Sequence, residues 1–135
     1  MIERTKTIIA NVTVVAVVIV ALIWGDSWYR QRTLFLRGEA DLSAGKAMAA
    51  IADYEAAIHM YTPASTLVDE SAQRLWGLGE SFEQAGDAAR ALIAYRALRS
   101  SFYAVRWFLQ PGKEWIARCD GKIAEILQRQ GYRQP

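Results

Sequence analysis

The longest apolar stretch of the chain runs from Ile8 to Trp24 and contains no charged residue, proline or glycine. At about 1.5 Å per residue, a helix of this length roughly spans the hydrocarbon core of a bilayer. The stretch is rich in valine and isoleucine, but a backbone in lipid must satisfy its own hydrogen bonds, which favours a helix. We therefore predict a transmembrane helix within residues 1–25.

Both ends of this stretch carry residues typical of a membrane boundary. Trp24, Trp28 and Tyr29 mark its far end, where amphipathic aromatic rings favour the lipid–water interface. Arg4 and Lys6 precede it and resemble the basic start of a secretory signal. The end of the stretch offers no small-x-small cleavage site, so we predict an uncleaved anchor, with a cleaved signal as the alternative.

Beyond the anchor, apolar residues recur at spacings of three and four, which predicts helices only. A first soluble helix, marked by Trp28, Phe35 and Leu42, is expected to continue straight out of the membrane helix. A second helix ends before Pro63. Its apolar stripe consists of Ala47, Ala50, Ile51, Tyr54, Ala57, Ile58 and Tyr61.

Capping and turn residues separate the remaining helices. Ser65 or the residue after it is suited to cap a helix, Gly86 to end that helix, and Asp87 to cap the next one. The helix after Asp87 is expected to run on as far as Trp107. A last helix is predicted at about 112–130. Its buried side is expected to hold Trp115, Cys119, Ile123, Ile126 and Leu127.

The segment from Leu75 to Tyr95 has the pattern Leu-x-x-Leu-Gly-x-x-Phe-x-x-x-Gly-Asp-x-x-x-Ala-x-x-x-Tyr. This pattern resembles the tetratricopeptide repeat, a pair of antiparallel helices of about 34 residues. Gly79 and Ala91 are small enough to let two helices approach closely, and the aromatic residues fill the space beside them. We assign this repeat to residues 75–104.

A fainter copy occupies residues 34–63. It precedes the clear copy by 41 residues, whereas about 34 is the period of the family. Arg37 and Asp41 depart from the family's leucine and aromatic residue. The matching positions are Gly38, Gly45, Ala50, Tyr54 and Ala57.

The resemblance implies an all-α fold, with one transmembrane helix followed by a tetratricopeptide-like domain over residues 26–135, about five helices in all. The helix at about 112–130 would cap the repeats. The family presents a concave surface to peptides or proteins, so the resemblance also implies protein–protein interaction. Such repeats normally stack in threes or more, so we expect added stability from a partner, from homo-oligomerisation or from the membrane.

The strongest candidate binding segment spans residues 100–111, because tyrosine, tryptophan and arginine are the side chains most often found as interface anchors. In the alternative interpretation these aromatic rings pack the second repeat against the last helix. A mixed case, with Phe102 buried and Arg106 or Trp107 available, is also open. The residues predicted to bind protein are Phe102, Tyr103, Arg106, Trp107 and Phe108.

Two polar residues interrupt the apolar helix. Asn11 and Thr13 lie near several alanines, and polar and small residues can pair transmembrane helices. Asn11 also lies only one turn inside the membrane boundary, where its amide can reach the lipid headgroups instead. Pairing of transmembrane helices through these two residues is therefore one of two hypotheses.

The inventory of chemically active residues is small. The chain has 16 basic and 14 acidic residues, a net charge of +2, which does not favour nucleic acid as a partner. His59 has no companions at metal-ligand spacing, and Cys119 is expected to be a small core residue. The numerous carboxylates, such as Glu70, Glu80 and Glu83, are expected on solvated faces. We predict neither an enzyme nor a bound cofactor or metal.

Taken with the resemblance, these features predict an adaptor or accessory subunit of a bacterial inner-membrane complex, with lipid and other membrane proteins as partners. The alternatives are a structural subunit held mainly through its transmembrane helix, and a membrane-bound hydrolase. Basic residues flank the anchor on both sides and give no clear topology. The signal-like tail favours a periplasmic domain, and a cytoplasmic domain is the alternative.

Overall fold

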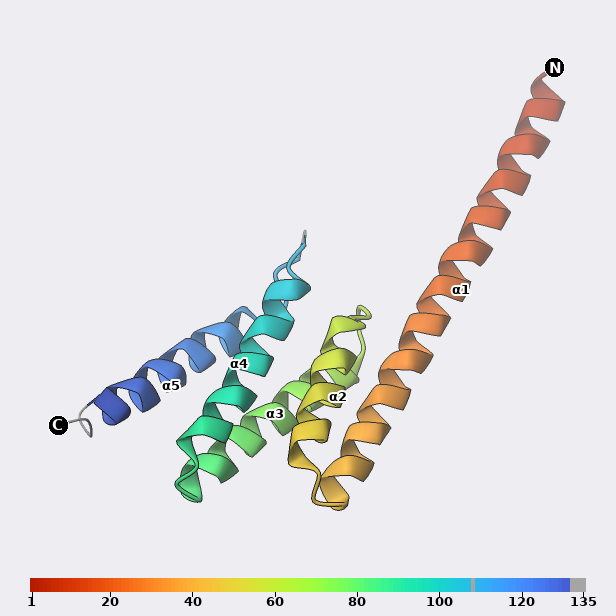
Figure 1. The fold of residues 1–135 in the computed structure, drawn as a ribbon. Coiled ribbons are helices and arrows are strands. Elements are labelled where there is room, and N and C mark those ends of the chain that lie inside the picture. The colour runs from red at the N-terminus through yellow and green to blue at the C-terminus, as the bar shows by residue number, and fades with distance from the viewer. Residues whose placement is uncertain (108, 132–135) are drawn as a thin grey trace.

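The computed structural model describes residues 1–107 and 109–131, and all the regular structure in these ranges is helical. The chain folds into a long N-terminal helix that extends away from a packed group of shorter helices (Figure 1). The all-α architecture with five helices is therefore confirmed. The helices are α1 (Ile2–Ser43), α2 (Ala47–His59), α3 (Thr66–Gln84), α4 (Ala88–Ala104) and α5 (Lys113–Gly131).

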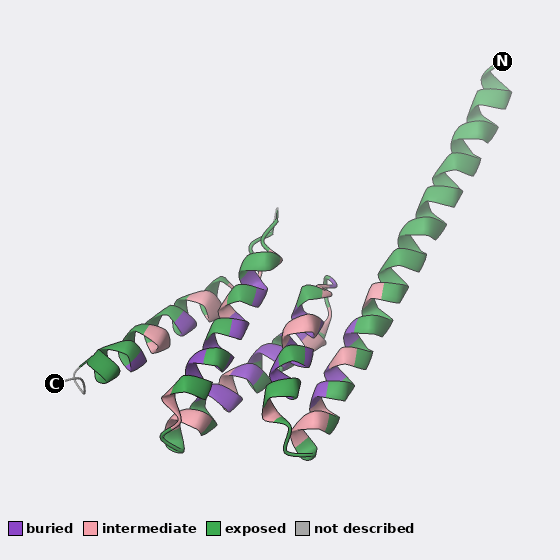
Figure 2. Cartoon of the chain, in the orientation of Figure 1, coloured by how far each residue is buried: buried purple, intermediate pink, exposed green. Residues whose placement is uncertain are grey.

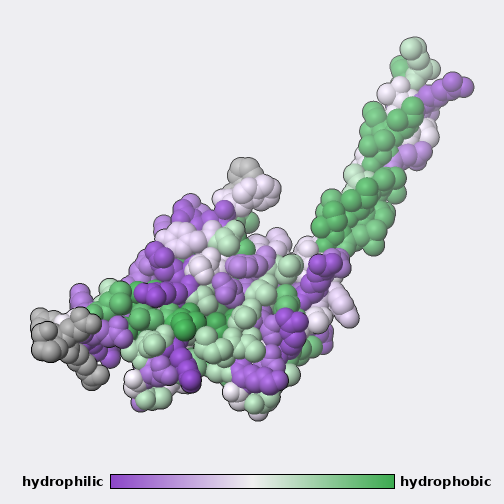
Figure 3. Space-filling model, in the orientation of Figure 1, coloured by the Kyte–Doolittle hydropathy of each residue, from purple (hydrophilic) through white to green (hydrophobic). Residues whose placement is uncertain are grey.

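The two halves of α1 have different surroundings. An 18-residue window of this helix has a mean hydropathy of 2.6 and is entirely exposed, so α1 is long and apolar enough to cross a membrane. Figures 2 and 3 show this half as an exposed apolar rod without neighbours. Burial begins at Gln31 and continues at Phe35 and Gly38, where α1 packs on α2. One uninterrupted helix therefore joins the candidate membrane span to the core.

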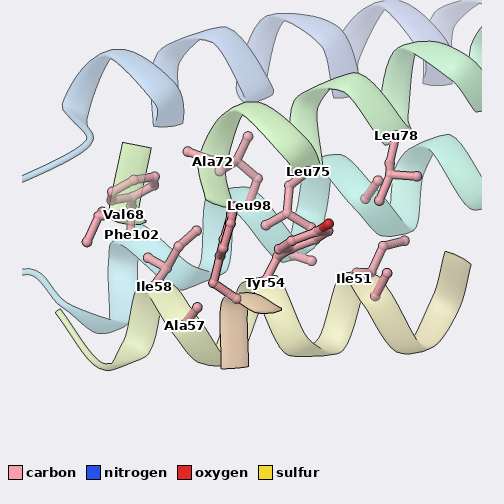
Figure 4. Close-up of a cluster of buried hydrophobic side chains, with 14 of the residues drawn as sticks. Ile51, Tyr54, Ala57, Ile58, Val68, Ala72, Leu75, Leu78, Leu98 and Phe102 are labelled. Carbon is pink, nitrogen blue, oxygen red and sulfur yellow. The ribbon is translucent and has the colours of Figure 1, made fainter. Parts of the chain in front are cut away.

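The packed region is a series of antiparallel helix pairs. The C-terminal part of α1 pairs with α2, α3 pairs with α4, and α5 packs on α4. The main core lies between the pairs, where Tyr54 and Ile58 of α2 meet Leu75 of α3 and Leu98 of α4 (Figure 4). A second, smaller cluster lies towards the C-terminus and is built from Ala91, Leu92, Tyr95 and Ile126.

The predicted caps and turns between helices are confirmed. The Ser65 hydroxyl caps α3 by accepting a hydrogen bond from Leu67 N at 3.3 Å, and the Asp87 carboxylate caps α4 by accepting one from Arg90 N at 3.0 Å. Gly86 has a φ of +76° in the turn before α4, a conformation that favours glycine. The helix α4 ends at Ala104, earlier than expected, and an irregular connection follows.

The two helix pairs contain the same close contact. Gly38 of α1 lies under the ring of Tyr54 in α2, and a Cβ on this glycine would come within 2.8 Å of the ring. Gly79 of α3 lies under the ring of Tyr95 in α4, where the distance would be 2.5 Å. Both members of the second pair lie 41 residues after their counterparts. The absence of a side chain on each glycine lets the tyrosine fill the space between two helices.

Candidate interaction surfaces

Phe102 belongs to the core and not to the surface. It is only 1% exposed, and its ring lies directly against Gly112 at the start of the last helix. Gly112 has a φ of +72°, and a Cβ there would collide with the ring. Phe102 therefore holds α4 against the α4–α5 connection, and the prediction that it contacts a partner directly is corrected.

The neighbours of Phe102 are exposed. Trp107 is 85% and Leu109 67% exposed, and Tyr103 is 40% exposed at the end of α4. The guanidinium of Arg106 lies 5.2 Å from the centre of the Tyr103 ring, and that of Arg99 lies 4.9 Å from it. Phe102 is therefore buried while Arg106 and Trp107 are exposed, as in the mixed case, and their binding to protein stays a prediction. Phe108, also a predicted binding residue, lies outside the described residues.

A hollow of about 270 Å³ lies between this connection and α5. Tyr103, Arg106 and Pro111 line one side, and Ile116 and Asp120 line the other. Asp120 accepts a hydrogen bond from Arg99, which ties α5 to α4 at the floor of this region. The hollow thus combines aromatic, aliphatic and charged groups on a surface open to solvent.

Three of the helices, α1, α3 and α5, carry side chains that reach across to one another. Arg74 of α3 forms an ion pair with Glu39 of α1 at 2.8 Å. On the other side of α3, the guanidinium of Arg118 in α5 lies 4.3 Å from the centre of the Trp76 ring and 4.6 Å from that of Trp115. We call these five residues the first-helix ladder. It runs across α1, α3 and α5.

Arg118 is exposed at its site against the two indole rings, whose centres lie 6.1 Å apart and whose planes are tilted by 52°. Cation–π attraction to both rings holds the guanidinium in place. Among the described residues no carboxylate forms an ion pair with Arg118, whereas Arg74, Arg90, Arg99 and Arg129 each have one. Its N–H groups are therefore available to an acceptor from another molecule.

Glu83 was expected on a solvated face, and this prediction is wrong. Its side chain is only 13% exposed and pairs with Lys122 at 3.1 Å and with Arg129 at 3.3 Å. It also accepts a hydrogen bond of 2.7 Å from the Tyr95 hydroxyl. Burial by itself raises the pKa of Glu83, but these hydrogen bonds and the two positive charges more than offset it, so the pKa is lowered. This network joins α3, α4 and α5.

Gln31 and Asp53 are buried polar residues that sequence reasoning missed. Gln31 is fully buried and donates from Nε2 to the carbonyl oxygen of Ala57 at 3.1 Å. Asp53 is 5% exposed and accepts hydrogen bonds from the guanidinium of Arg37. Both cross from α1 to α2 and fix the register of that pair. For Gln31 the signal in the sequence is its position four residues before Phe35, on the same face of the helix.

The anchor residues lie along the exposed half of α1. Trp24, Trp28 and Tyr29 are 54%, 43% and 66% exposed, just before the helix enters the core. The hydroxyl of Thr13 donates to the carbonyl oxygen of Ile9 at 2.8 Å, so it is already satisfied within the helix. The amide of Asn11 is exposed in the apolar stretch and remains the polar group suited to helix pairing.

Cys119 is a core residue, as predicted. It is fully buried in the main cluster, and burial, together with the charge of Asp120, raises its pKa to about 12. The thiol is therefore protonated at neutral pH and shielded from solvent. His59 lies exposed at the end of α2. Within the described residues no group of three or more His, Cys, Asp or Glu side chains is placed to hold a metal ion.

Comparisons of this chain with protein-family models, with curated protein sequences and with solved structures gave no match. The resemblance to the tetratricopeptide repeat accordingly stays a prediction. It rests on the pattern of Leu75 to Tyr95 and agrees with the close contact of Gly79 and Tyr95.

Proposed function

We propose that this protein is a membrane-anchored adaptor, in which the helix α1 holds a small tetratricopeptide-like domain at a bacterial inner membrane. The observation that carries the proposal is the continuity of α1. An exposed apolar span passes, without a break, into a helix whose Phe35 and Gly38 are buried in the core. Such a rod sets the domain at a fixed height above the bilayer. We further propose that the domain lies in the periplasm.

The proposed partner is another protein of the same membrane, and the first-helix ladder is the proposed docking surface. Its central feature is Arg118, which is exposed to solvent and whose guanidinium lies against both the Trp76 and the Trp115 ring. A guanidinium held by two aromatic rings is in place before binding, so it loses little conformational freedom when it pairs with a carboxylate. The partner is therefore expected to present an acidic side chain or a C-terminal carboxylate to this face.

The proposal is tested by isolating tagged full-length protein from membranes in mild detergent and identifying proteins recovered in stoichiometric amounts. Arg118→Ala should lower the recovery of the partner by about tenfold or more, because a desolvated charge pair is lost. Arg96→Ala is the matched control, since Arg96 is an exposed arginine on α4, away from the ladder. Equal recovery with both variants would place the partner elsewhere, and no recovered protein from any variant would contradict the adaptor function.

A second candidate function is that of a structural subunit held by contacts within the bilayer. It is favoured by the exposed amide of Asn11, because a polar side chain in hydrocarbon gains a hydrogen bond when a second helix supplies a partner. Asn11→Leu keeps the length and apolar character of α1. Loss of the partner with Asn11→Leu, combined with retention in Arg118→Ala, would favour this second function over the adaptor.

A further inference from the structure

Gln31 of α1 hydrogen-bonds to the end of α2 and to the α2–α3 connection, at the end of the domain that lies nearest the candidate membrane span. Besides its bond to the carbonyl oxygen of Ala57, its Oε1 accepts a hydrogen bond of 2.5 Å from the Ser65 hydroxyl. Seven residues separate Gln31 from Trp24, where the apolar stretch ends, which is about 10 Å of helix. In a chain anchored by α1, the α2–α3 connection therefore lies close to the lipid boundary.

The α4–α5 connection lies at the same end of the domain and projects further. The Ser100 hydroxyl donates to Glu55 of α2 at 3.3 Å, one turn before the end of each helix, so α2 and α4 end side by side. Figure 1 shows the connection continuing from there past the α2–α3 connection, towards the side on which the N-terminal half of α1 lies. The connection thus extends beyond the other helix ends of the packed region, in the direction of the exposed apolar half of α1.

The projecting end of the connection carries large apolar groups and a cation. We call Tyr103, Arg106, Trp107 and Leu109 the tip. Trp107 and Leu109 are among the most exposed large apolar residues outside α1, and clustered exposed apolar groups mark a binding surface. Phe102 already fills the space between α4 and the start of α5. The tip is therefore not needed to close the core.

We propose that the tip inserts into the lipid–water interface and forms a second membrane contact, a proposal that rests on the anchoring by α1 proposed above. Tryptophan and tyrosine prefer this interface, and leucine favours the acyl region beneath it. Arg106 can extend its guanidinium to lipid phosphates while its aliphatic stem stays in contact with the apolar layer. The lipid surface is favoured over a protein partner because the connection projects from the packed helices on the side where the exposed apolar half of α1 lies.

The second contact determines the orientation of the domain. A single helix allows the domain to rotate about the helix axis, whereas two separated contacts remove that rotation. The tip lies on α4 and the connection after it, while the first-helix ladder lies on α1, α3 and α5. With both contacts in place, the ladder always faces the same direction along the membrane, so a partner in the bilayer meets it without an orientational search.

The test places a single nitroxide reporter on the full-length protein in vesicles of phosphatidylcholine with phosphatidylglycerol. Leu109→Cys reports on the tip, Val17→Cys on the middle of the apolar span, and Ala89→Cys on the opposite end of the domain, where the residue is exposed at the start of α4. Collisions with oxygen, which concentrates in lipid, are compared with collisions with a water-soluble nickel complex. Cys119 is buried, and unsubstituted protein controls for its labelling.

The proposal predicts oxygen-dominated collisions at positions 17 and 109 and nickel-dominated collisions at position 89. Adding Trp107→Ser should move the reporter at 109 towards nickel while leaving the thermal unfolding midpoint unchanged, since Trp107 is exposed. A reporter in lipid at 17 but in water at 109 would overturn the second contact alone. Water at both positions would refute the anchor as well. Protection of position 109 from both reagents would indicate a protein on the tip and would also overturn the proposal.

Discussion

In the first helix pair, α1 and α2, the ring of Tyr54 lies on Gly38, and in the second pair, α3 and α4, the ring of Tyr95 lies on Gly79. Each tyrosine hydroxyl donates to a glutamate of the first helix, and that glutamate in turn pairs with a basic side chain of the following unit. In the first pair the glutamate is Glu39, which directly follows the glycine, and its basic partner is Arg74.

In the second pair the corresponding glutamate lies one turn further along the helix. Tyr95 donates to Glu83 and not to Glu80, which is the residue 41 positions after Glu39. Glu83 is also less exposed and meets two cations of α5, Lys122 and Arg129. Each helix pair is thus linked to the helix that follows it through a glutamate, although this glutamate stands at different positions in the two pairs. Aligning the two copies by sequence therefore hides part of their likeness.

Removing either tyrosine ring should have the largest effect on stability. Tyr54 and Tyr95 are both fully buried, and deleting an aromatic side chain from a core costs roughly 3–5 kcal/mol of unfolding free energy. Tyr54→Ala and Tyr95→Ala should each lower stability by such an amount in urea unfolding in mild detergent, followed by tryptophan fluorescence. A loss below about 1 kcal/mol in either variant would contradict the packing described for that pair.

Replacing the buried glycines by alanine should lower the free energy of unfolding by less than the tyrosine substitutions do. The size of the loss should differ between the two helix pairs. Gly79→Ala would bring a Cβ to 2.5 Å from the Tyr95 ring, and Gly38→Ala would bring one to 2.8 Å from the Tyr54 ring. Overpacking of this kind costs about 1–3 kcal/mol, with the larger loss expected at Gly79. Gly77→Ala is the matched control on the same helix, because its Cβ would meet no atom within 4 Å. It should stabilise the protein by up to about 1 kcal/mol, as alanine favours helix.

Alanine at the turn glycine of either helix pair should lower the free energy of unfolding by the same amount. Gly45 and Gly86 have φ angles of +77° and +76°, and their N–H groups bond carbonyl oxygens three residues earlier at 3.0 Å in both cases. Alanine in this left-handed conformation costs about 1–2 kcal/mol. Gly45→Ala and Gly86→Ala should therefore lower unfolding free energy by the same amount within error. A clear difference between them would show that the two turns are not equivalent.

Removing the tyrosine hydroxyl groups should lower the free energy of unfolding slightly, and by different amounts in the two helix pairs. Removing a hydrogen bond of this kind typically costs about 1 kcal/mol, and the less exposed carboxylate should give the larger loss. Tyr95→Phe is therefore expected to destabilise the protein more than Tyr54→Phe, because the side chain of Glu83 is 13% exposed and that of Glu39 is 31% exposed. The reverse order, measured by the same unfolding assay, would contradict this comparison of the two carboxylates.

The smallest predicted effect is a pH dependence of the second pair. Because the pKa of Glu83 is lowered in the folded chain, its contribution is present above the unfolded pKa of about 4.3 and is lost as pH falls through the lower folded value. The wild type should therefore be more stable than Glu83→Gln at neutral pH, and this advantage should shrink as the pH approaches about 3. A constant difference across this range would show that the carboxylate charge contributes nothing.

Local signals in the sequence predict much of the fold. The apolar span of α1, the caps at Ser65 and Asp87 and the turn at Gly86 depend only on residues near one another in the chain. The apolar stripe of α2 likewise identifies its buried face, where Tyr54 and Ile58 enter the core. Each of these features is set by periodicity or by the geometry of one or two residues.

The features that the sequence did not predict depend on contacts between distant residues. Glu83 looks like any exposed carboxylate until α5 brings Lys122 and Arg129 to it. Gln31 is buried because the end of α2 offers the carbonyl oxygen of Ala57. Phe102 is buried through Gly112, ten residues later, and no local pattern separates it from the exposed Trp107. Candidate sites of this kind follow from tertiary packing, which a single sequence does not encode in any short window.

We propose above that the domain recognises a partner while α1 holds it at the membrane. The most direct measurement replaces residues 8–24 with an unrelated transmembrane helix of leucine and alanine of the same length, and compares stoichiometric partners of the two proteins in mild detergent. We expect the same partner with both anchors, and its loss when Arg118→Ala is added to either. A partner lost with the native anchor alone would contradict the adaptor and assign recognition to the membrane-spanning helix.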